Sequence, residues 1–146
     1  MSNNKLHILF DSSKKSAISA IKLVEASIEG YNSFNPSKDY TPKELEPFDA
    51  LSDRFIRSVE VCIKFFRTYE KILHGESSEN LRDLLNRMAK GKLISSVELW
   101  FKMRDVRNRI VHKYLPSDLK KIYESVSKKF GNELVSLHKK LDKLIL

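Results

Sequence analysis

Apolar residues recur at spacings of three and four along most of the chain, which is the repeat of helices that bury one face. The first such segment predicts a helix from about Ser12 to Tyr31, with Asp11 or Ser12 as its N-terminal cap. A shorter helix is predicted over about residues 78–89, stopping around Gly91. The pattern therefore indicates a helical protein before any other property is considered.

The second helix has the clearest start signal. The stretch TPKE at residues 41–44 places a capping hydroxyl, a first-turn proline and a reciprocal carboxylate in order. Pro47 leaves open whether this helix is continuous or has a separate first turn, with a main helix that begins at Phe48. In both cases the apolar stripe continues to about His74, where Gly75 is expected to end it.

Two more helices are predicted towards the C-terminus. We expect the fourth helix to start at Ser95, with Glu98 as its capping partner. After Pro116, Ser117 is expected to cap a last helix. Because its apolar repeat continues through Gly131, the pattern favours one long helix over two.

Residues 31–47 are rich in Asn, Ser and Pro, and we expect them to form an irregular connection between the first two helices. No internal repeat, low-complexity tract or domain-separating linker is visible, so residues 1–146 are predicted to form a single domain. The predicted fold class is all-α, a compact antiparallel bundle of four to five helices.

The composition supports this class and limits the chemistry. Four Gly and four Pro in 146 residues suit a helical globular protein. Cys62 is the one cysteine, which excludes an intramolecular disulfide and a thiolate metal cluster, and its place on the apolar stripe indicates packing. The apolar runs are too short for a signal peptide or a membrane span, so we expect a cytoplasmic protein without membrane association.

The charge is strongly basic, with 27 Lys and Arg against 19 Asp and Glu and a net charge of +8. This excess favours a polyanionic partner, either nucleic acid or an acidic protein, although an ordinary solvated surface gives the same balance. The histidines lack metal-ligand spacing, and the chain contains no HExxH, GxGxxG, P-loop or GxSxG motif. We therefore expect neither a metal site nor a bound cofactor.

The densest chemistry lies in the stretch RDVRNRIVHKY, residues 104–114. On a helix, Asn108, Arg109 and His112 share the face opposite the core stripe, and Asn108 and His112 are one turn apart. Arg107 falls about 140° from His112, so one ideal helix does not bring them together. Either the helix loosens before the next proline, or the arginine side chain wraps round, or a second subunit supplies the partner. A solvated face without function gives the same pattern, and the helix dipole alone favours a histidine there.

Residues 107–114 match the pattern R-x-x-x-x-H-x-Y, with an asparagine directly after the arginine. This stretch resembles the signature of HEPN-domain toxins of the HepT type. The resemblance extends to the order of elements: a long second helix carrying residues 53–55, the motif near the end of the fourth helix, then a proline and a terminal amphipathic helix. The length of the 31–47 connection and the N-terminal segment depart from that family.

The resemblance implies a HEPN-like homodimer that acts as a metal-independent endoribonuclease, the toxin of a toxin–antitoxin system. Its antitoxin would be a nucleotidyltransferase of the MNT type that attaches AMP to Tyr114. Arg107 and His112 from two protomers would line a composite cleft at the dimer interface. A second subunit would then bring together the arginine and the histidine that a single helix keeps apart.

RNA cleavage in such a cleft needs few groups, because RNA carries its own nucleophile, the 2′-OH. His112 is the candidate proton-transfer group near neutral pH, and Arg107 offers a planar fork to the phosphate charge of the transition state. Asn108 would orient the imidazole or contact the phosphate. The positive charge that holds the RNA backbone would come from Arg104, Arg109 and Lys113.

Two other interpretations remain open. One is a non-catalytic HEPN-like subunit that binds a nucleotidyltransferase partner, with the motif serving as interface or modification substrate. The other is a plain helical adaptor with a basic surface. Whether Asp53 or Glu60 of the second helix joins the cleft is also left open.

Overall fold

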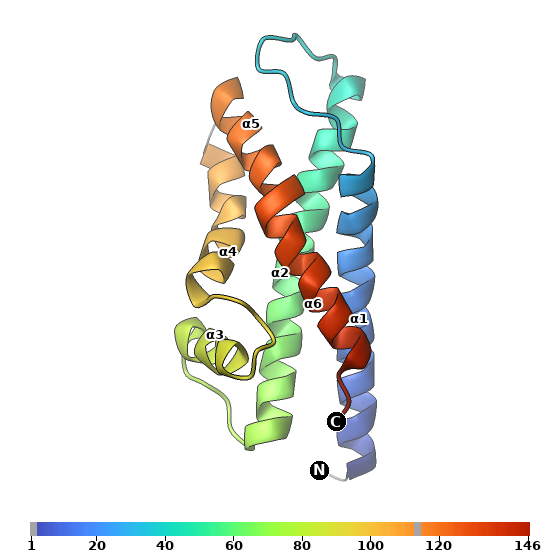
Figure 1. The fold of residues 1–146 in the computed structure, drawn as a ribbon, viewed down its shortest axis with the longest axis vertical. Coiled ribbons are helices and arrows are strands. Elements are labelled where there is room, and N and C mark those ends of the chain that lie inside the picture. Colours follow the sequence, from blue (N-terminus) through green and yellow to red (C-terminus); the bar gives the residue numbers. More distant parts are fainter. Residues whose placement is uncertain (1–2, 113–114) are drawn as a thin grey trace.

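The computed structural model describes residues 3–112 and 115–146, and within them all regular secondary structure is helical (Figure 1). This confirms the predicted all-α class. Helices α1 and α2 run antiparallel as a long hairpin, α4 packs on α2, and the rod formed by α5, η1 and α6 lies against both α1 and α2. The elements are α1 Asn3–Glu29, α2 Pro42–His74, α3 Leu81–Lys90, α4 Val97–His112, α5 Pro116–Ser125, the π-helical turn η1 Val126–Phe130, and α6 Gly131–Lys143.

Helix α1 begins at Asn3, well before the predicted start at Ser12. The Ser12 hydroxyl does not cap the helix; its Oγ donates to the Leu9 carbonyl inside it. The extra turns are held by Phe10, which is buried and lies with its ring centroid 5.9 Å from Phe65 of α2. The prediction missed these turns because a contact between two helices stabilises them, and a local capping signal does not report such a contact.

Helix α2 confirms the predicted caps. The Thr41 hydroxyl accepts a hydrogen bond from the Glu44 amide at 3.2 Å, and the Glu44 carboxylate accepts one from the Thr41 amide at 3.0 Å. Pro47 lies inside one continuous helix, where it removes a single donor near the N-terminus. At the other end Gly75 adopts a left-handed φ of 70° and donates to the Lys71 carbonyl at 2.9 Å.

The irregular connection is shorter than residues 31–47, because α2 already begins at Pro42. It is also packed. Phe34 is 5% exposed, stacks on Tyr40 at 5.0 Å, and meets Phe48 and Tyr123 edge to face. This aromatic cluster fixes the connection against the start of α2 and against α5.

Two serines predicted to start helices instead bind buried carboxylates. Helix α3 is capped by Asn80, while Ser78 donates from its amide and its hydroxyl to the buried Glu70 of α2. Burial opposes ionisation of Glu70, but the bonds from Ser78 and the nearby charge of Arg87 hold its pKa below the ordinary value. The prediction of a helix start at residue 78 was therefore wrong.

The start of α4 is displaced in the same way. Ser96, not Ser95, accepts the capping hydrogen bond, from the Leu99 amide at 3.2 Å. Ser95 donates from its amide and hydroxyl to Glu133 of α6, at 3.0 and 2.7 Å. The same carboxylate accepts from the Trp100 indole at 2.8 Å, so α6 fixes the first turn of α4.

The last helical rod is continuous through Gly131, as predicted, but it contains the π-helical turn η1. Its start differs from the prediction, since Leu115 occupies the N-cap without a side-chain hydrogen bond and Ser117 lies inside the helix. Gly131 packs so closely on α1 that a Cβ atom there would lie 2.5 Å from Cδ1 of Ile28. The absence of a side chain lets the rod approach α1.

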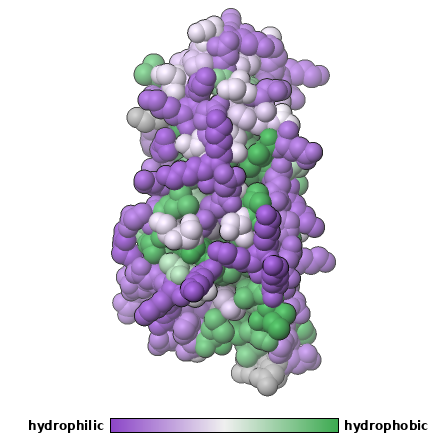
Figure 2. Space-filling model, viewed as in Figure 1, coloured by the Kyte–Doolittle hydropathy of each residue, from purple (hydrophilic) through white to green (hydrophobic). Residues whose placement is uncertain are grey.

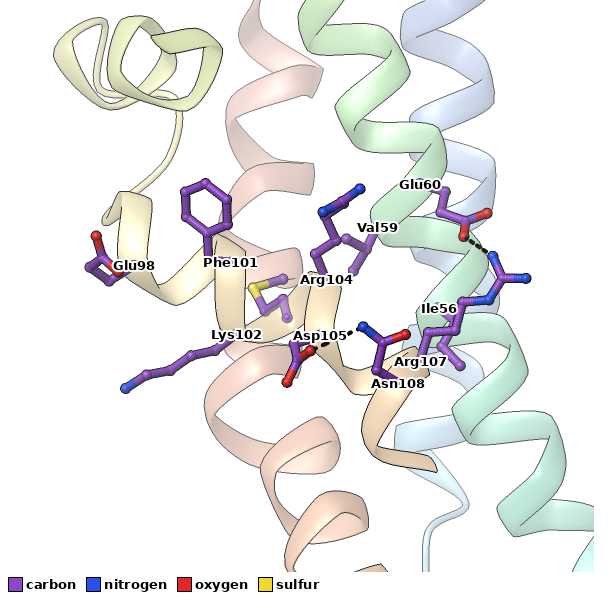
Figure 3. Close-up of a pocket in the computed structure, with 11 residues that line it drawn as sticks. Ile56, Val59, Glu60, Glu98, Phe101, Lys102, Arg104, Asp105, Arg107 and Asn108 are labelled. Carbon is purple, nitrogen blue, oxygen red and sulfur yellow. Dashed lines mark hydrogen bonds and ion pairs between the residues drawn. The ribbon is translucent and has the colours of Figure 1, made fainter. Parts of the chain in front are cut away.

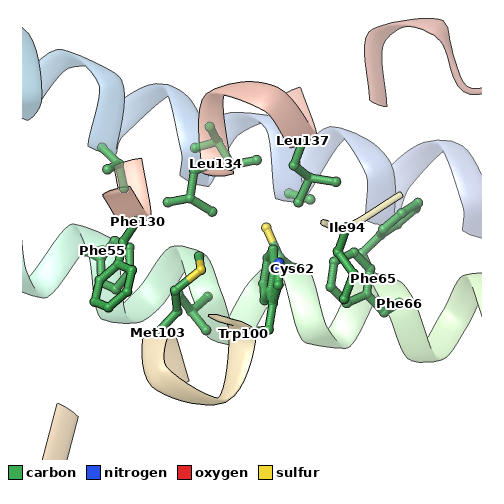
Figure 4. Packing of buried hydrophobic residues seen from close by; sticks show 14 of the residues in the cluster. Phe55, Cys62, Phe65, Phe66, Ile94, Trp100, Met103, Phe130, Leu134 and Leu137 are labelled. Atoms are coloured by element: carbon green, nitrogen blue, oxygen red, sulfur yellow. The ribbon is translucent and has the colours of Figure 1, made fainter. Parts of the chain in front are cut away.

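The core lies where α2 meets α1, α3, α4, α6 and η1, and Figure 4 shows part of it. Cys62 is fully buried among these side chains, which confirms its packing role, and burial raises the pKa of its thiol. On the outer surface, Figure 2 shows hydrophobic residues gathered towards the end that carries both termini. Among the described residues, no helix is long and apolar enough to cross a membrane.

Candidate functional site

A groove of about 700 Å³ lies between the middle of α2 and the length of α4 (Figure 3). Helix α4 supplies most of its wall, and α2 supplies the opposite side. The lining residues are Ile56, Val59, Glu60, Glu98, Phe101, Lys102, Met103, Arg104, Asp105, Arg107 and Asn108.

Arg107 and Glu60 face one another across this groove. Nη1 of Arg107 donates to Oε1 of Glu60 at 3.0 Å, and the two side chains are 66% and 56% exposed. The arginine side chain of α4 therefore extends towards α2, as Figure 3 shows. Glu60, which the sequence left as an open candidate, is part of the groove, whereas Asp53 pairs with Arg57 at 2.9 Å on the surface of α2.

Asn108 also lines the groove, but its amide is directed to an acidic neighbour. Its Nδ2 donates to Oδ1 of Asp105, one turn earlier in α4, at 3.3 Å. The predicted role of Asn108, to orient His112 or to contact phosphate, stays a prediction. Arg104 is exposed on the groove wall.

His112 is the last residue of α4 and is exposed to solvent. It does not line the groove that holds Arg107, and neither does the half-buried Arg109. One chain therefore does not bring the histidine of the motif into the groove that holds the arginine. The predicted residues Lys113 and Tyr114 lie outside the described part of the chain.

The charges of the groove are balanced, although the whole chain carries +8. Glu98 is held by Arg82 at 2.7 Å, and the Arg82 guanidinium lies 4.7 Å from the centre of the Phe101 ring. The groove therefore carries both basic and acidic side chains, and it is not a purely basic surface. Its charged lining residues are Lys102, Arg104 and Arg107 against Glu60, Glu98 and Asp105.

Several of these residues were not among the sequence candidates. Glu98 was expected as a cap, and Lys102 and Phe101 were not singled out. A signal was present: Glu98, Lys102 and Asp105 are spaced by four and three, which places them on one polar face of a helix. No comparable local pattern joins Glu60 to Arg107, because they lie 47 positions apart.

The family model described as "Nucleotidyltransferase substrate binding protein like" matches residues 14–143. The match spans most of the chain, includes the 31–47 connection and begins after the first turns of α1. No curated protein matches the chain.

Proposed function

The chain belongs to the nucleotidyltransferase substrate binding protein-like family, and on this premise we propose that it is the HepT-type toxin of a HEPN/MNT toxin–antitoxin pair. Its substrate is RNA, and its antitoxin is a nucleotidyltransferase of the MNT type. The observation that carries the proposal is the placement of the R-x-x-x-x-H-x-Y motif: Arg107 lies in an open groove and His112 lies at the exposed end of the same helix.

The active form is a homodimer. Because His112 does not line the groove that holds Arg107 in one chain, a second copy brings an arginine and a histidine to one phosphate. One apolar residue within the motif and one directly after it support such pairing. Val111 is 56% exposed and Leu115 is 65% exposed, and burial of both against a second copy removes apolar surface from water.

The proposed reaction uses no metal. The 2′-OH of the substrate loses its proton to one His112 imidazole and attacks the adjacent phosphorus. The bond from phosphorus to the 5′-oxygen breaks, and the departing oxygen takes a proton from an imidazolium, which leaves a 2′,3′-cyclic phosphate and a 5′-hydroxyl. Arg107 stabilises the negative charge that grows on the phosphate oxygens.

Three more cations and one amide have supporting roles in this proposal. Asn108 lines the groove with Arg107, and its proposed role is to contact a bound phosphate. The RNA backbone is attracted by Arg104, Arg109 and Lys113. The antitoxin controls the site by attaching AMP to Tyr114, which introduces a phosphodiester charge within the motif.

Cleavage of single-stranded RNA by the purified protein tests the proposal. We expect His112→Ala and Arg107→Ala each to lower the cleavage rate by about a hundredfold or more. The matched controls His74→Ala and Arg57→Ala remove an exposed histidine and an exposed arginine outside the groove, and they should cleave like the wild type. Circular dichroism and sedimentation should show unchanged helicity and assembly in all four variants. Cleavage that persists in both motif variants would place the active site elsewhere.

The second candidate function is that of a non-catalytic subunit which binds a nucleotidyltransferase. The name of the matched family favours it, because that name describes substrate binding for a nucleotidyltransferase and no hydrolysis. A stable complex with a nucleotidyltransferase, together with intact RNA in the presence of the wild-type protein, would select this alternative.

A further inference from the structure

We propose that Glu60 is an internal competitor for RNA phosphate at Arg107, so that the groove binds RNA only by exchanging one anion for another. The inference rests on the proposed function in taking RNA as the ligand. It adds a regulatory role for a residue of α2 that lies outside the motif.

The contact geometry carries this inference. The Glu60 carboxylate meets the Arg107 guanidinium with one hydrogen bond, from Nη1 to Oε1 at 3.0 Å. Carboxylate and phosphate oxygens use the same planar donors of an arginine, so Glu60 occupies part of the surface that a phosphate needs. The pair is exposed on both sides, at 66% and 56%, and therefore open to exchange with an anion from solution.

The other charged residues of the groove indicate how the exchange proceeds. Within the described residues, Lys102 and Arg104 have no carboxylate partner, while Glu98 is already held by Arg82. Incoming phosphate can therefore be attracted by two free cations before it reaches Arg107. Glu60 is the groove carboxylate that holds the motif arginine itself.

The strength of the contact sets the size of the effect. An ion pair as exposed as this one changes an equilibrium by about two- to fivefold, because water and salt screen it. Glu60 therefore attenuates RNA binding and does not abolish it. A buried ion pair would prevent RNA from binding to Arg107, whereas this exposed pair only lowers the affinity of the groove for RNA.

Binding of a 2′-O-methyl single-stranded RNA tests the inference, because that probe has no free 2′-OH to react. Fluorescence anisotropy should show Glu60→Gln binding about two- to fivefold more tightly than the wild type. The plot of log affinity against log salt should be steeper by about 0.7, since a freed Arg107 releases one more counterion on binding phosphate. In an Arg107→Ala background the same substitution should give no gain.

Asp53→Asn is the matched control. It removes the same charge and breaks an exposed Asp–Arg pair of 2.9 Å on the same helix, outside the groove. An equal gain in this control, or a gain from Glu60→Gln that survives without Arg107, would show a general charge effect and overturn the inference. Unchanged or weaker binding by Glu60→Gln, or no binding by any variant at low salt, would also overturn it.

The outcome is separable from that of the proposed function. If Glu60→Gln tightens binding but unmodified RNA stays intact, the cleavage proposal fails and the competition stands. If wild-type protein cleaves RNA through Arg107 and His112 but Glu60→Gln leaves binding unchanged, the competition fails and the ribonuclease stands.

Discussion

The indole Nε1 of Trp100 in α4 lies 2.8 Å from Oε2 of Glu133 in α6, and both side chains are buried. The same carboxylate accepts two further hydrogen bonds, from the amide and the hydroxyl of Ser95. One acidic side chain thus satisfies three donors at the start of α4. Since α4 forms most of the groove wall, this contact sets the position of the candidate site.

Removal of this carboxylate should destabilise the fold. We expect Glu133→Ala to lower the free energy of unfolding by about 2–4 kcal/mol, because it leaves the buried donors of Trp100 and Ser95 without an acceptor. Glu133→Gln keeps one carbonyl oxygen and should cost less. Urea denaturation followed by circular dichroism measures both changes. A cost below about 0.5 kcal/mol for the alanine variant would show that water replaces the carboxylate.

Gly131→Ala should also destabilise the protein, although alanine normally favours a helix. A Cβ atom at this position would lie 2.5 Å from Cδ1 of Ile28 and 2.6 Å from the backbone oxygen of Val126. We expect the clash to outweigh the gain in helix propensity and to lower the unfolding free energy by about 1–3 kcal/mol. Gly91→Ala is the control, because its nearest contact would be an ordinary 3.5 Å. Equal thermal stability of the two variants would contradict the predicted clash.

The stability of the N-terminus of α2 should depend on pH through Glu44. The hydrogen bond with Lys38 and those with Thr41 lower its pKa from 4.5 to about 2. A carboxyl whose pKa is depressed by folding stabilises the folded state above its unfolded pKa, and this stabilisation is lost as the pH falls towards the folded value. Glu44→Gln should therefore melt below the wild type at pH 7, and the gap should narrow between about pH 4.5 and 2. Thermal melts at a series of pH values measure it, and a gap independent of pH would refute it.

Modification of Tyr114 should silence the proposed ribonuclease. An AMP group adds a phosphodiester charge near the motif, where it competes with RNA phosphate for Arg107. We expect the AMP-modified protein to cleave RNA at least tenfold more slowly than the unmodified protein. Tyr114→Phe should keep cleavage but resist the nucleotidyltransferase, which mass spectrometry of the treated protein would show. Equal cleavage rates before and after modification would exclude this control mechanism.

The sequence by itself determined the all-α class and the capped ends of α2. Both follow from interactions between residues no more than four positions apart, such as the Thr41–Glu44 capping box and the left-handed Gly75. It also placed the motif at the end of the fourth helix and indicated that Arg107 and His112 do not meet within one helix. The angular separation of the two residues follows from helix geometry alone.

Only the tertiary structure decided which groups the remaining polar residues bind. Serine is a common N-cap residue, yet Ser78 and Ser95 each bind a buried glutamate of a helix distant in the sequence. The reason is that an unpaired carboxylate in the core costs more free energy than a lost helix cap. The extra turns of α1 depend on the contact of Phe10 with α2. The pairing of Arg107 with Glu60 spans 47 positions and exists only because α4 packs beside α2. Contacts of this kind arise when helices meet, so no spacing along the chain records them.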